Sequence, residues 1–189
     1  MLGARGDARG LRARSVTVGY GKDAPILEDL SLDVLEGQLT VIVGPNACGK
    51  STLLRSLARV LGVRSGVVEL DGQALTTMNQ KELARRLGLL AQSSTAPADI
   101  LVEDLVARGR YPHQSLLRQW SAEDDEAVAW AMRQAGVEAL ARRRVGELSG
   151  GQRQRVWIAM VLAQSTDIVL LDEPTTYLDL NHQLEVLRL

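Results

Sequence analysis

The sequence predicts an α/β domain in which a strand-rich core is interrupted by a helical insert. Strand-like segments dominate residues 11–91, helical patterns dominate residues 100–162, and a short apolar strand returns at residues 168–171. The 189 residues are 46% hydrophobic and 24% charged, which is ordinary for a globular chain and favours one main core, with room for a subdomain.

The chain begins with short strand candidates. Residues 11–18 alternate between apolar and polar side chains, as a half-buried strand does, and residues 30–35 form a second candidate. Residues 39–43 (LTVIV) are a short apolar run bounded by Gly37 and Gly44, which is typical of a buried strand. We therefore expect a buried strand there.

A helix is expected from Lys50 to about Leu61, ended by Gly62. Its apolar stripe consists of Leu53, Leu54, Leu57 and Val60. The other expected elements are a strand at 66–70, a helix at 79–86, a strand at 87–91, helices at 100–107, 122–135 and 150–162, a strand at 168–171 and a helix beginning at 184.

Charge and cysteine content restrict the classes of function. Lys and Arg (22) nearly balance Asp and Glu (23), and a net charge of −1 lacks the basic character typical of nucleic-acid binders. The single cysteine, Cys48, excludes an internal disulfide. The longest apolar runs fall well short of the roughly 18 residues that span a bilayer, and the basic N-terminus lacks the apolar stretch of a secretory signal. We expect a soluble, intracellular protein.

Residues 44–51 carry the first chemical motif, because they fit G-x-x-x-x-G-K-[ST] between an expected strand and an expected helix. Glycines let backbone N–H groups approach phosphate oxygens, and the helix N-terminus adds partial positive charge. Lys50 would contact the β- and γ-phosphates, and the Ser51 hydroxyl would ligate Mg²⁺. A chance glycine-rich turn is the alternative, but the flanking pattern disfavours it.

Residues 168–173 (IVLLDE) place two carboxylates after four apolar residues. Beside a phosphate loop, Asp172 at such a strand end would hold the metal, and Glu173 would polarise the attacking water as a general base. Alone, the pattern is more often just a strand end. Residues 148–152 (LSGGQ) form a second phosphate-ready helix N-terminus, this time without a lysine.

These motifs together resemble the ATP-binding subunit of ABC transporters. GPNACGKST (44–52) is similar to the family's Walker A motif, LSGGQ (148–152) to its signature and IVLLDEP (168–174) to Walker B. Tyr20 matches the adenine-stacking aromatic residue, Gln92 the Q-loop glutamine and Asp179 the D-loop aspartate. The resemblance covers essentially the whole chain. It implies a P-loop NTPase fold, with a RecA-like core, antiparallel N-terminal strands and an inserted α-helical subdomain.

The resemblance implies roles for these residues, with ATP and Mg²⁺ as the cofactors. The implied catalytic residues are Lys50, Gln92, Asp172 and Glu173, and the implied metal ligands are Ser51, Gln92 and Asp172. The implied nucleotide-binding residues are Tyr20, Gly44, Pro45, Asn46, Ala47, Cys48, Gly49, Lys50, Ser51, Thr52, Ser149, Gly150, Gly151, Gln152 and Asp179.

Longer matches, among them GPNACGKSTLLRSL and LVARGRYPHQ, resemble ATPases of ferric-siderophore importers, which are related to cobalamin and haem importers. Implied partners are a second copy in a head-to-tail dimer, integral-membrane permease subunits and, indirectly, an extracytoplasmic substrate-binding protein, but no nucleic acid. The implied location is peripheral, at the cytoplasmic face of the membrane. His113 and Arg110 are expected to be surface residues, the arginine as part of a solvated face or a permease contact.

One ABC ATPase domain is expected, composed of residues 1–91, the helical subdomain 92–162 and a return to the core at 163–189. The chain resembles a C-terminally truncated subunit, because the family's last core strands and switch histidine have no counterpart here; His182 comes too soon. Two alternatives to a transport ATPase stay open. One is a non-hydrolysing nucleotide-binding fragment, and the other is a soluble ABC ATPase without a transport role.

Overall fold

The structure is a computed structural model that describes residues 9–92, 94–115 and 119–174. The chain divides into two compact units, residues 1–83 and 84–189. Each is described by itself. Among the described residues, none of the helices combines the length and the hydropathy needed to cross a bilayer.

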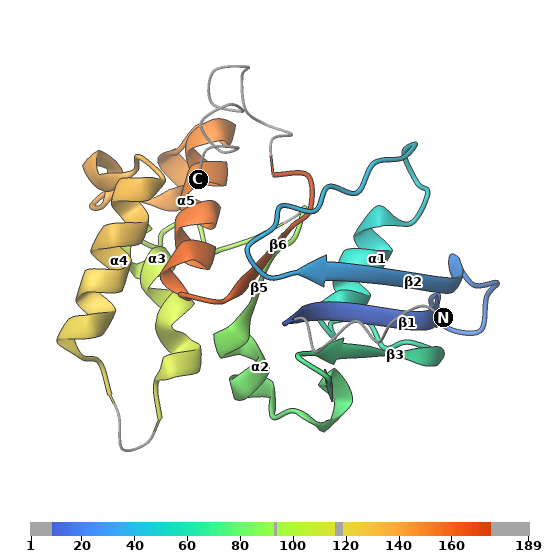
Figure 1. Ribbon diagram of the computed structural model, residues 1–189. Coiled ribbons are helices and arrows are strands. Elements are labelled where there is room, and N and C mark those ends of the chain that lie inside the picture. Colours follow the sequence, from blue (N-terminus) through green and yellow to red (C-terminus); the bar gives the residue numbers. More distant parts are fainter. Residues whose placement is uncertain (1–8, 93, 116–118, 175–189) are drawn as a thin grey trace. The chain divides into compact units, whose positions relative to one another are not determined.

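Unit 1 is built on a four-stranded antiparallel sheet with the order β2-β1-β3-β4 (Figure 1). Its strands are β1 (Gly10–Val18), β2 (Leu27–Leu35), β3 (Ser65–Leu70) and the short β4 (Gln73–Ala74). Helix α1 (Lys50–Leu57) packs on β1, and α2 (Gln80–Arg86) follows the 3-10 turn η1 (Leu75–Thr77). The predicted strands at 11–18, 30–35 and 66–70 and the predicted helix at 79–86 are therefore confirmed.

A bulge in β1 keeps its apolar side chains on one face. Leu11 and Ala13 are buried, and so are Val16 and Val18, although the two pairs differ in parity. The pairing of β1 with β2 shifts between Ala13 and Val16, where Ser15 takes a φ of 45°. An extra residue at that point restores the inward direction of the second pair.

Two predictions in unit 1 are wrong. Residues 39–43 form no strand, and Leu39, Val41 and Val43 are 82, 68 and 85% exposed. A buried strand needs neighbours for its backbone N–H and C=O groups, and among the described residues none pairs with this segment. Gly62 does not end the first helix either, because α1 already ends at Leu57.

The residue that ends α1 is Arg59, in the left-handed conformation with a φ of 56°. The Val60 N–H donates to Arg55 O and the Arg59 N–H to Ser56 O, which is the Schellman pattern. The Arg59 guanidinium donates to Leu75 O and, at 2.7 Å, to Met78 O. These side-chain bonds explain why an arginine stands where glycine is usual.

Unit 2 combines a parallel strand pair with a helical group. Strands β5 (Leu87–Leu90) and β6 (Ile168–Leu171) pair in parallel. Helices α3 (Val102–Ala107), α4 (Ala122–Gln134) and α5 (Gly150–Ala163) pack on one another (Figure 1). The 3-10 segments η2 (Arg108–His113), η3 (Glu138–Leu140) and η4 (Val145–Glu147) connect them. The predicted elements between residues 87 and 171 are confirmed; the helix expected from 184 lies outside the described residues.

Candidate functional site

The phosphate loop joins exposed chain to the first turn of α1. Helix α1 begins at Lys50, and its N-cap, Gly49, has a φ of 98°. A Cβ at Gly49 would lie 2.9 Å from side-chain atoms of both Ile26 and Leu27. Glycine is required here for two reasons, since a side chain would be strained in this conformation and would collide with the start of β2. The loop therefore lies close to the start of β2 at the residue that precedes α1.

Lys50 folds back over the loop. Its Nζ donates to Gly44 O at 3.0 Å and to Pro45 O at 2.7 Å. Neutral carbonyls are weaker acceptors for an ammonium group than phosphate oxygens. The lysine is thus positioned at the mouth of the loop, on acceptors that an anionic ligand can replace.

Tyr20 lies in the same unit, between β1 and β2. Its hydroxyl accepts a hydrogen bond from Arg55 Nη1 of α1 at 3.3 Å, and the residue is 42% exposed. The backbone carbonyl of Tyr20 accepts from Arg64 Nη2 at 3.1 Å. The aromatic ring is therefore tethered to the helix that follows the phosphate loop and still presents surface for stacking.

In unit 2, three predicted site residues meet at the carboxyl ends of β5 and β6. Because the strands are parallel, with Leu90 opposite Leu171, the residues that follow them emerge at one edge. The Asp172 N–H donates to Leu90 O at 2.9 Å, which continues the ladder by one residue. The Gln92 Nε2 donates to Glu173 Oε2 at 2.7 Å. Asp172 is buried and Glu173 is exposed.

The turn after β6 has an unusual backbone. Glu173 takes a φ of 49°, a left-handed conformation that is uncommon for a side chain other than glycine, asparagine or aspartate. The next residue, Pro174, accepts a hydrogen bond through its carbonyl from Gln154 Nε2 of α5, at 3.1 Å. Gln154 was not among the site residues predicted from the sequence. Its spacing was a signal, since it lies three and four residues before the buried Trp157 and Ile158, on an otherwise apolar stripe.

The second glycine motif forms the N-terminus of α5. Ser149 is the N-cap, and its Oγ accepts from the Gln152 N–H at 3.3 Å, while Gln152 Oε1 accepts from the Ser149 N–H at 3.1 Å. This reciprocal capping box leaves Ser149 and Gly150 exposed at the positive end of a 14-residue helix. The exposed N-terminus of α5 is therefore electrostatically suited to bind an anion.

The donor chemistry fits Mg²⁺. A serine hydroxyl, a glutamine amide oxygen and an aspartate carboxylate are the hard oxygen ligands that Mg²⁺ takes, usually together with substrate phosphates and water. Gln92 and Asp172 end neighbouring strands of unit 2, and Ser51 opens α1 of unit 1. Asp179, predicted to bind nucleotide, lies outside the described residues.

The prediction for Arg110 is wrong, because this arginine is 5% exposed. Its Nε donates to Asp124 Oδ1 at 2.8 Å and its Nη1 to Ala163 O at 2.9 Å. The guanidinium therefore ties η2 to the start of α4 and the end of α5. His113, three residues after Arg110, is partly buried, and its Nε2 lies 2.8 Å from Gln164 O.

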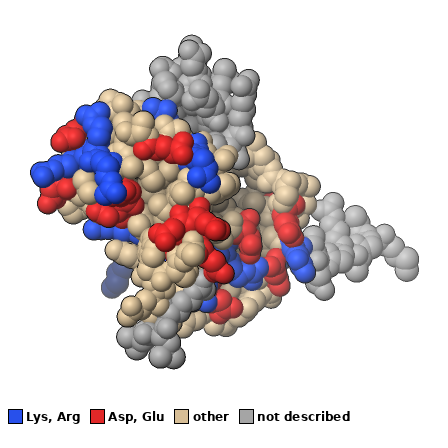
Figure 2. All heavy atoms as spheres, turned by 90° about the vertical axis from the view of Figure 1, so that its left-hand side faces the viewer, with Lys and Arg blue, Asp and Glu red and all other residues tan. Residues whose placement is uncertain are grey.

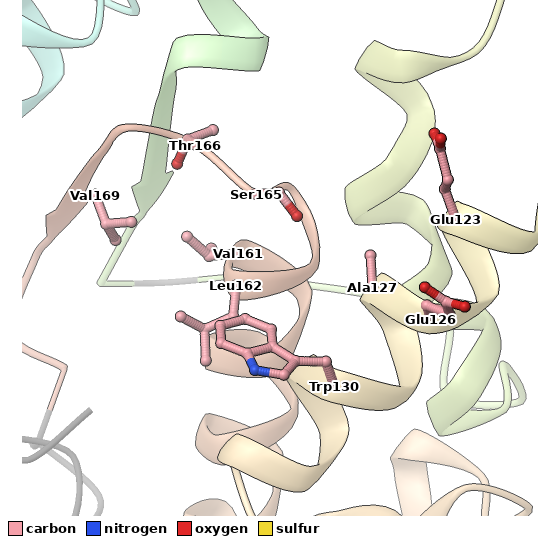
Figure 3. Close-up of a pocket in the computed structure, with 9 residues that line it drawn as sticks. All are labelled: Glu123, Glu126, Ala127, Trp130, Val161, Leu162, Ser165, Thr166 and Val169. Carbon is pink, nitrogen blue, oxygen red and sulfur yellow. The ribbon is translucent and has the colours of Figure 1, made fainter.

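One cavity of unit 2 lies away from these residues. It measures about 460 Å³ and lies between α4, the end of α5 and the start of β6 (Figure 3). The lining residues are Glu123, Glu126, Ala127, Trp130, Val161, Leu162, Ser165, Thr166 and Val169. The signature begins at the other end of α5, and Glu173 follows the other end of β6, so the cavity is not part of the candidate site.

A lysine-bearing phosphate loop at a helix start and an Asp-Glu pair after a parallel strand define a P-loop NTPase. The ABC transporter family model matches residues 27–176. The chain therefore belongs to the ABC transporter family, and its fold is the ABC ATPase fold, as the resemblance predicts.

Similar proteins place the chain within this family. It is 55% identical to the ferric enterobactin transport ATP-binding protein FepC of Escherichia coli (strain K12), with 95% of this chain and 66% of FepC covered. It is 52% identical to the siderophore transport system ATP-binding protein YusV of Bacillus subtilis (strain 168), with 95% and 65% covered. A bacterial Atm1-family ABC exporter with ATP bound has a TM-score of 0.82 at 30% identity, over 96% of this chain and 32% of the exporter. The chain thus spans slightly less than two thirds of the length of these curated relatives.

Proposed function

We propose that this protein binds and hydrolyses ATP to energise import through an ABC transporter, with iron-siderophore complexes as the cargo. The observation that carries the proposal is the Gln92–Glu173 contact at the end of β5 and β6, since it brings together the amide and the carboxylate to which the resemblance gives catalytic roles. The names of the two siderophore-transport relatives support the choice of cargo.

Lys50 and the loop N–H groups bind the phosphate chain, and Tyr20 stacks on the adenine. Gln92 keeps the Glu173 carboxylate oriented until nucleotide arrives. Glu173 then accepts a proton from the attacking water as the water oxygen bonds to the γ-phosphorus, and the bond from that phosphorus to the bridging oxygen breaks to release ADP. Ser51, Gln92 and Asp172 would hold Mg²⁺, which would supply positive charge to offset that of the phosphate oxygens. Of the two carboxylates, the exposed Glu173 is the one that water reaches.

The capped N-terminus of α5 carries a phosphate-binding end without a lysine. We infer that Ser149, Gly150, Gly151 and Gln152 contact the γ-phosphate bound to a second copy in a head-to-tail dimer. The affinity for ATP then differs between the open and the closed dimer. This difference in binding free energy drives the conformational change.

The partners that fit this role are integral-membrane permease subunits, reached through a helical subdomain at residues 92–162, and indirectly an extracytoplasmic binding protein. The protein would lie at the cytoplasmic face of the membrane as a peripheral subunit. On the face shown in Figure 2, acidic and basic side chains are interspersed, which suits protein contacts better than a nucleic-acid backbone.

Phosphate release from Mg-ATP tests the proposal, with Glu173→Gln as the inactive variant and Glu138→Gln, an exposed carboxylate on η3, as the matched control. We expect release by the wild type and by Glu138→Gln, and loss of at least about 100-fold for Glu173→Gln. ATP binding without release by the wild type would instead assign a non-hydrolysing nucleotide-binding role. Co-purification with a polytopic membrane protein in detergent tests the transport assignment.

A further inference from the structure

The turn that carries Glu173 is held from two sides. Glu173 has a left-handed backbone and precedes a proline, and residues before proline favour extended backbone. Such a conformation persists only where the surroundings impose it. On one side the Asp172 N–H is bonded to Leu90 O of β5, and on the other the Pro174 carbonyl is bonded to Gln154 of α5.

The side chain of Gln154 is itself restrained by burial. The residue is 8% exposed, on a helix whose next turns are packed into the core through Trp157, Ile158 and Val161. The amide therefore has little freedom, and the hydrogen bond fixes the backbone one residue beyond Glu173. The Glu173 side chain is meanwhile bonded to Gln92, so backbone and carboxylate are restrained by different elements.

We propose that Gln154 is a positioning residue for hydrolysis, which holds Pro174 and thereby aims the Glu173 carboxylate from the same helix whose N-terminus carries the signature. The proposal rests on the role of Glu173 given above. It links two points near the N-terminus of one rigid element: Ser149 caps α5, and Gln154 contacts the Glu173 turn little more than one helical turn further on. A movement of α5 on binding phosphate at its tip thus moves the general base.

Gln154→Leu removes the hydrogen-bond donor and replaces the amide with an apolar side chain of similar size. The matched control is Gln164→Leu at the other end of α5, because Gln164 Nε2 also donates to backbone carbonyls, those of Ala84 and Leu87, far from Glu173. Gln154→Glu, which retains the size of the side chain, serves as a second variant. All are made in the full chain and compared in thermal unfolding, ATP affinity, kcat and KM.

We expect both Gln154 variants to lower kcat by about tenfold with KM and ATP affinity within about twofold of wild type, since one hydrogen bond is lost and the nucleotide loop is untouched. Gln164→Leu is expected to lower the melting temperature but to keep kcat. Unchanged kcat in Gln154→Leu, a parallel loss in Gln164→Leu, or failure of both Gln154 variants to fold would overturn the positioning role.

A readout without turnover separates this proposal from the proposed function. In protein labelled with ¹³C at glutamate Cδ, the Glu173 signal is the one that Glu173→Gln removes. Gln154→Leu is expected to shift this signal, and Gln164→Leu is expected to leave it in place. If the wild type releases no phosphate but the shift is seen, the hydrolytic function fails and the positioning of Glu173 stands. An unshifted signal refutes the positioning whether or not ATP is hydrolysed.

Discussion

At the scale of single residues, Lys50 supplies the charge that the phosphate loop itself lacks. Its ammonium group lies on two neutral carbonyls of its own loop, at 3.0 and 2.7 Å, and ATP offers charged oxygens in their place. We expect Lys50→Ala to weaken ATP binding by roughly 10- to 100-fold, the range for a lost charge-assisted hydrogen bond. Isothermal titration calorimetry measures the effect, with Lys81→Ala, on α2 of the same unit, as the control. Equal affinities for the two variants would contradict the role of Lys50.

Asp124 gives a second prediction at this scale, because it is 1% exposed and paired with Arg110. Burial would raise the pKa of Asp124, but hydrogen bonds from Arg110 and Ser121 outweigh it and hold that pKa below its ordinary value. The folded state therefore favours the ionised form. The resulting stability is present above the unfolded pKa, near pH 4, and is lost as the pH falls through the lower folded value.

We expect Asp124→Asn to lower the free energy of unfolding by about 3 kcal/mol at pH 7, because the Arg110 charge loses its buried partner. The difference between wild type and variant should shrink between pH 5 and pH 3, a window set by the pKa of aspartate. Urea unfolding across that range measures it. Asp125→Asn, an exposed neighbour in the same helical turn, should change stability by about 1 kcal/mol or less. A gap that does not depend on pH would refute the assigned linkage.

The roles of residues in short local motifs can be predicted from the sequence. The roles of residues that depend on tertiary contacts cannot. Lys50 and Glu173 were predicted because short spacings specify them, and the structure gives both the contacts described above. Arg110 was expected on a solvated face because the residues next to it give no sign of its partners. Those partners, Asp124 and Ala163, lie 14 and 53 residues further along the chain. Gln154 was overlooked although a polar side chain on an apolar stripe was visible.

At the scale of elements, the packing of η2 on α5 depends on Gly109. A Cβ there would lie 2.2 Å from Met160 O and 3.2 Å from Ala163 Cβ, so η2 and α5 approach as closely as backbone allows. We expect Gly109→Ala to lower the free energy of unfolding by about 2 to 3 kcal/mol, because rigid backbone must move aside. Gly62→Ala is the control, since a Cβ at Gly62 meets nothing within 4 Å and its φ is not positive. Chemical denaturation compares them, and equal stabilities would show that the contact relaxes freely.

Elements were predicted well where their stabilising contacts are local. The helices at 122–134 and 150–163 have caps, Ser121 and Ser149, that the sequence places directly before the periodic run. The segment at 39–43 was predicted wrongly because an apolar run indicates only that burial is favourable. It does not show that a neighbouring strand is present to pair with it. Likewise, glycine chemistry pointed to Gly62 as the helix end, whereas Arg59 ends the helix because distant carbonyls hold its side chain.

At the scale of the whole molecule, one chain carries two helix N-termini that we propose bind anions, Lys50 with its loop in unit 1 and Ser149 with its glycines in unit 2. If the two ends bind the same nucleotide only across a two-fold dimer, each of two sites takes one end from each copy. Lys50→Ala and Gly151→Asp then damage different halves of every site. Each variant alone should be inactive, since both of its sites contain one damaged half.

Mixing the two variants tests this assembly. In a mixed dimer one site contains both damaged halves, and the other contains the intact loop of one copy and the intact signature of its partner. Random pairing makes half the dimers mixed, so the mixture should recover about a quarter of wild-type phosphate release if each intact site turns over independently. A mixture of Lys50→Ala with Glu173→Gln is the control. In the proposed dimer Lys50 and Glu173 belong to the same half-site, so each site of a mixed dimer contains one damaged half and no recovery is expected. Recovery in the first mixture and not in the control supports the head-to-tail site, and an inactive Lys50→Ala and Gly151→Asp mixture would show that the two helix ends do not share a nucleotide.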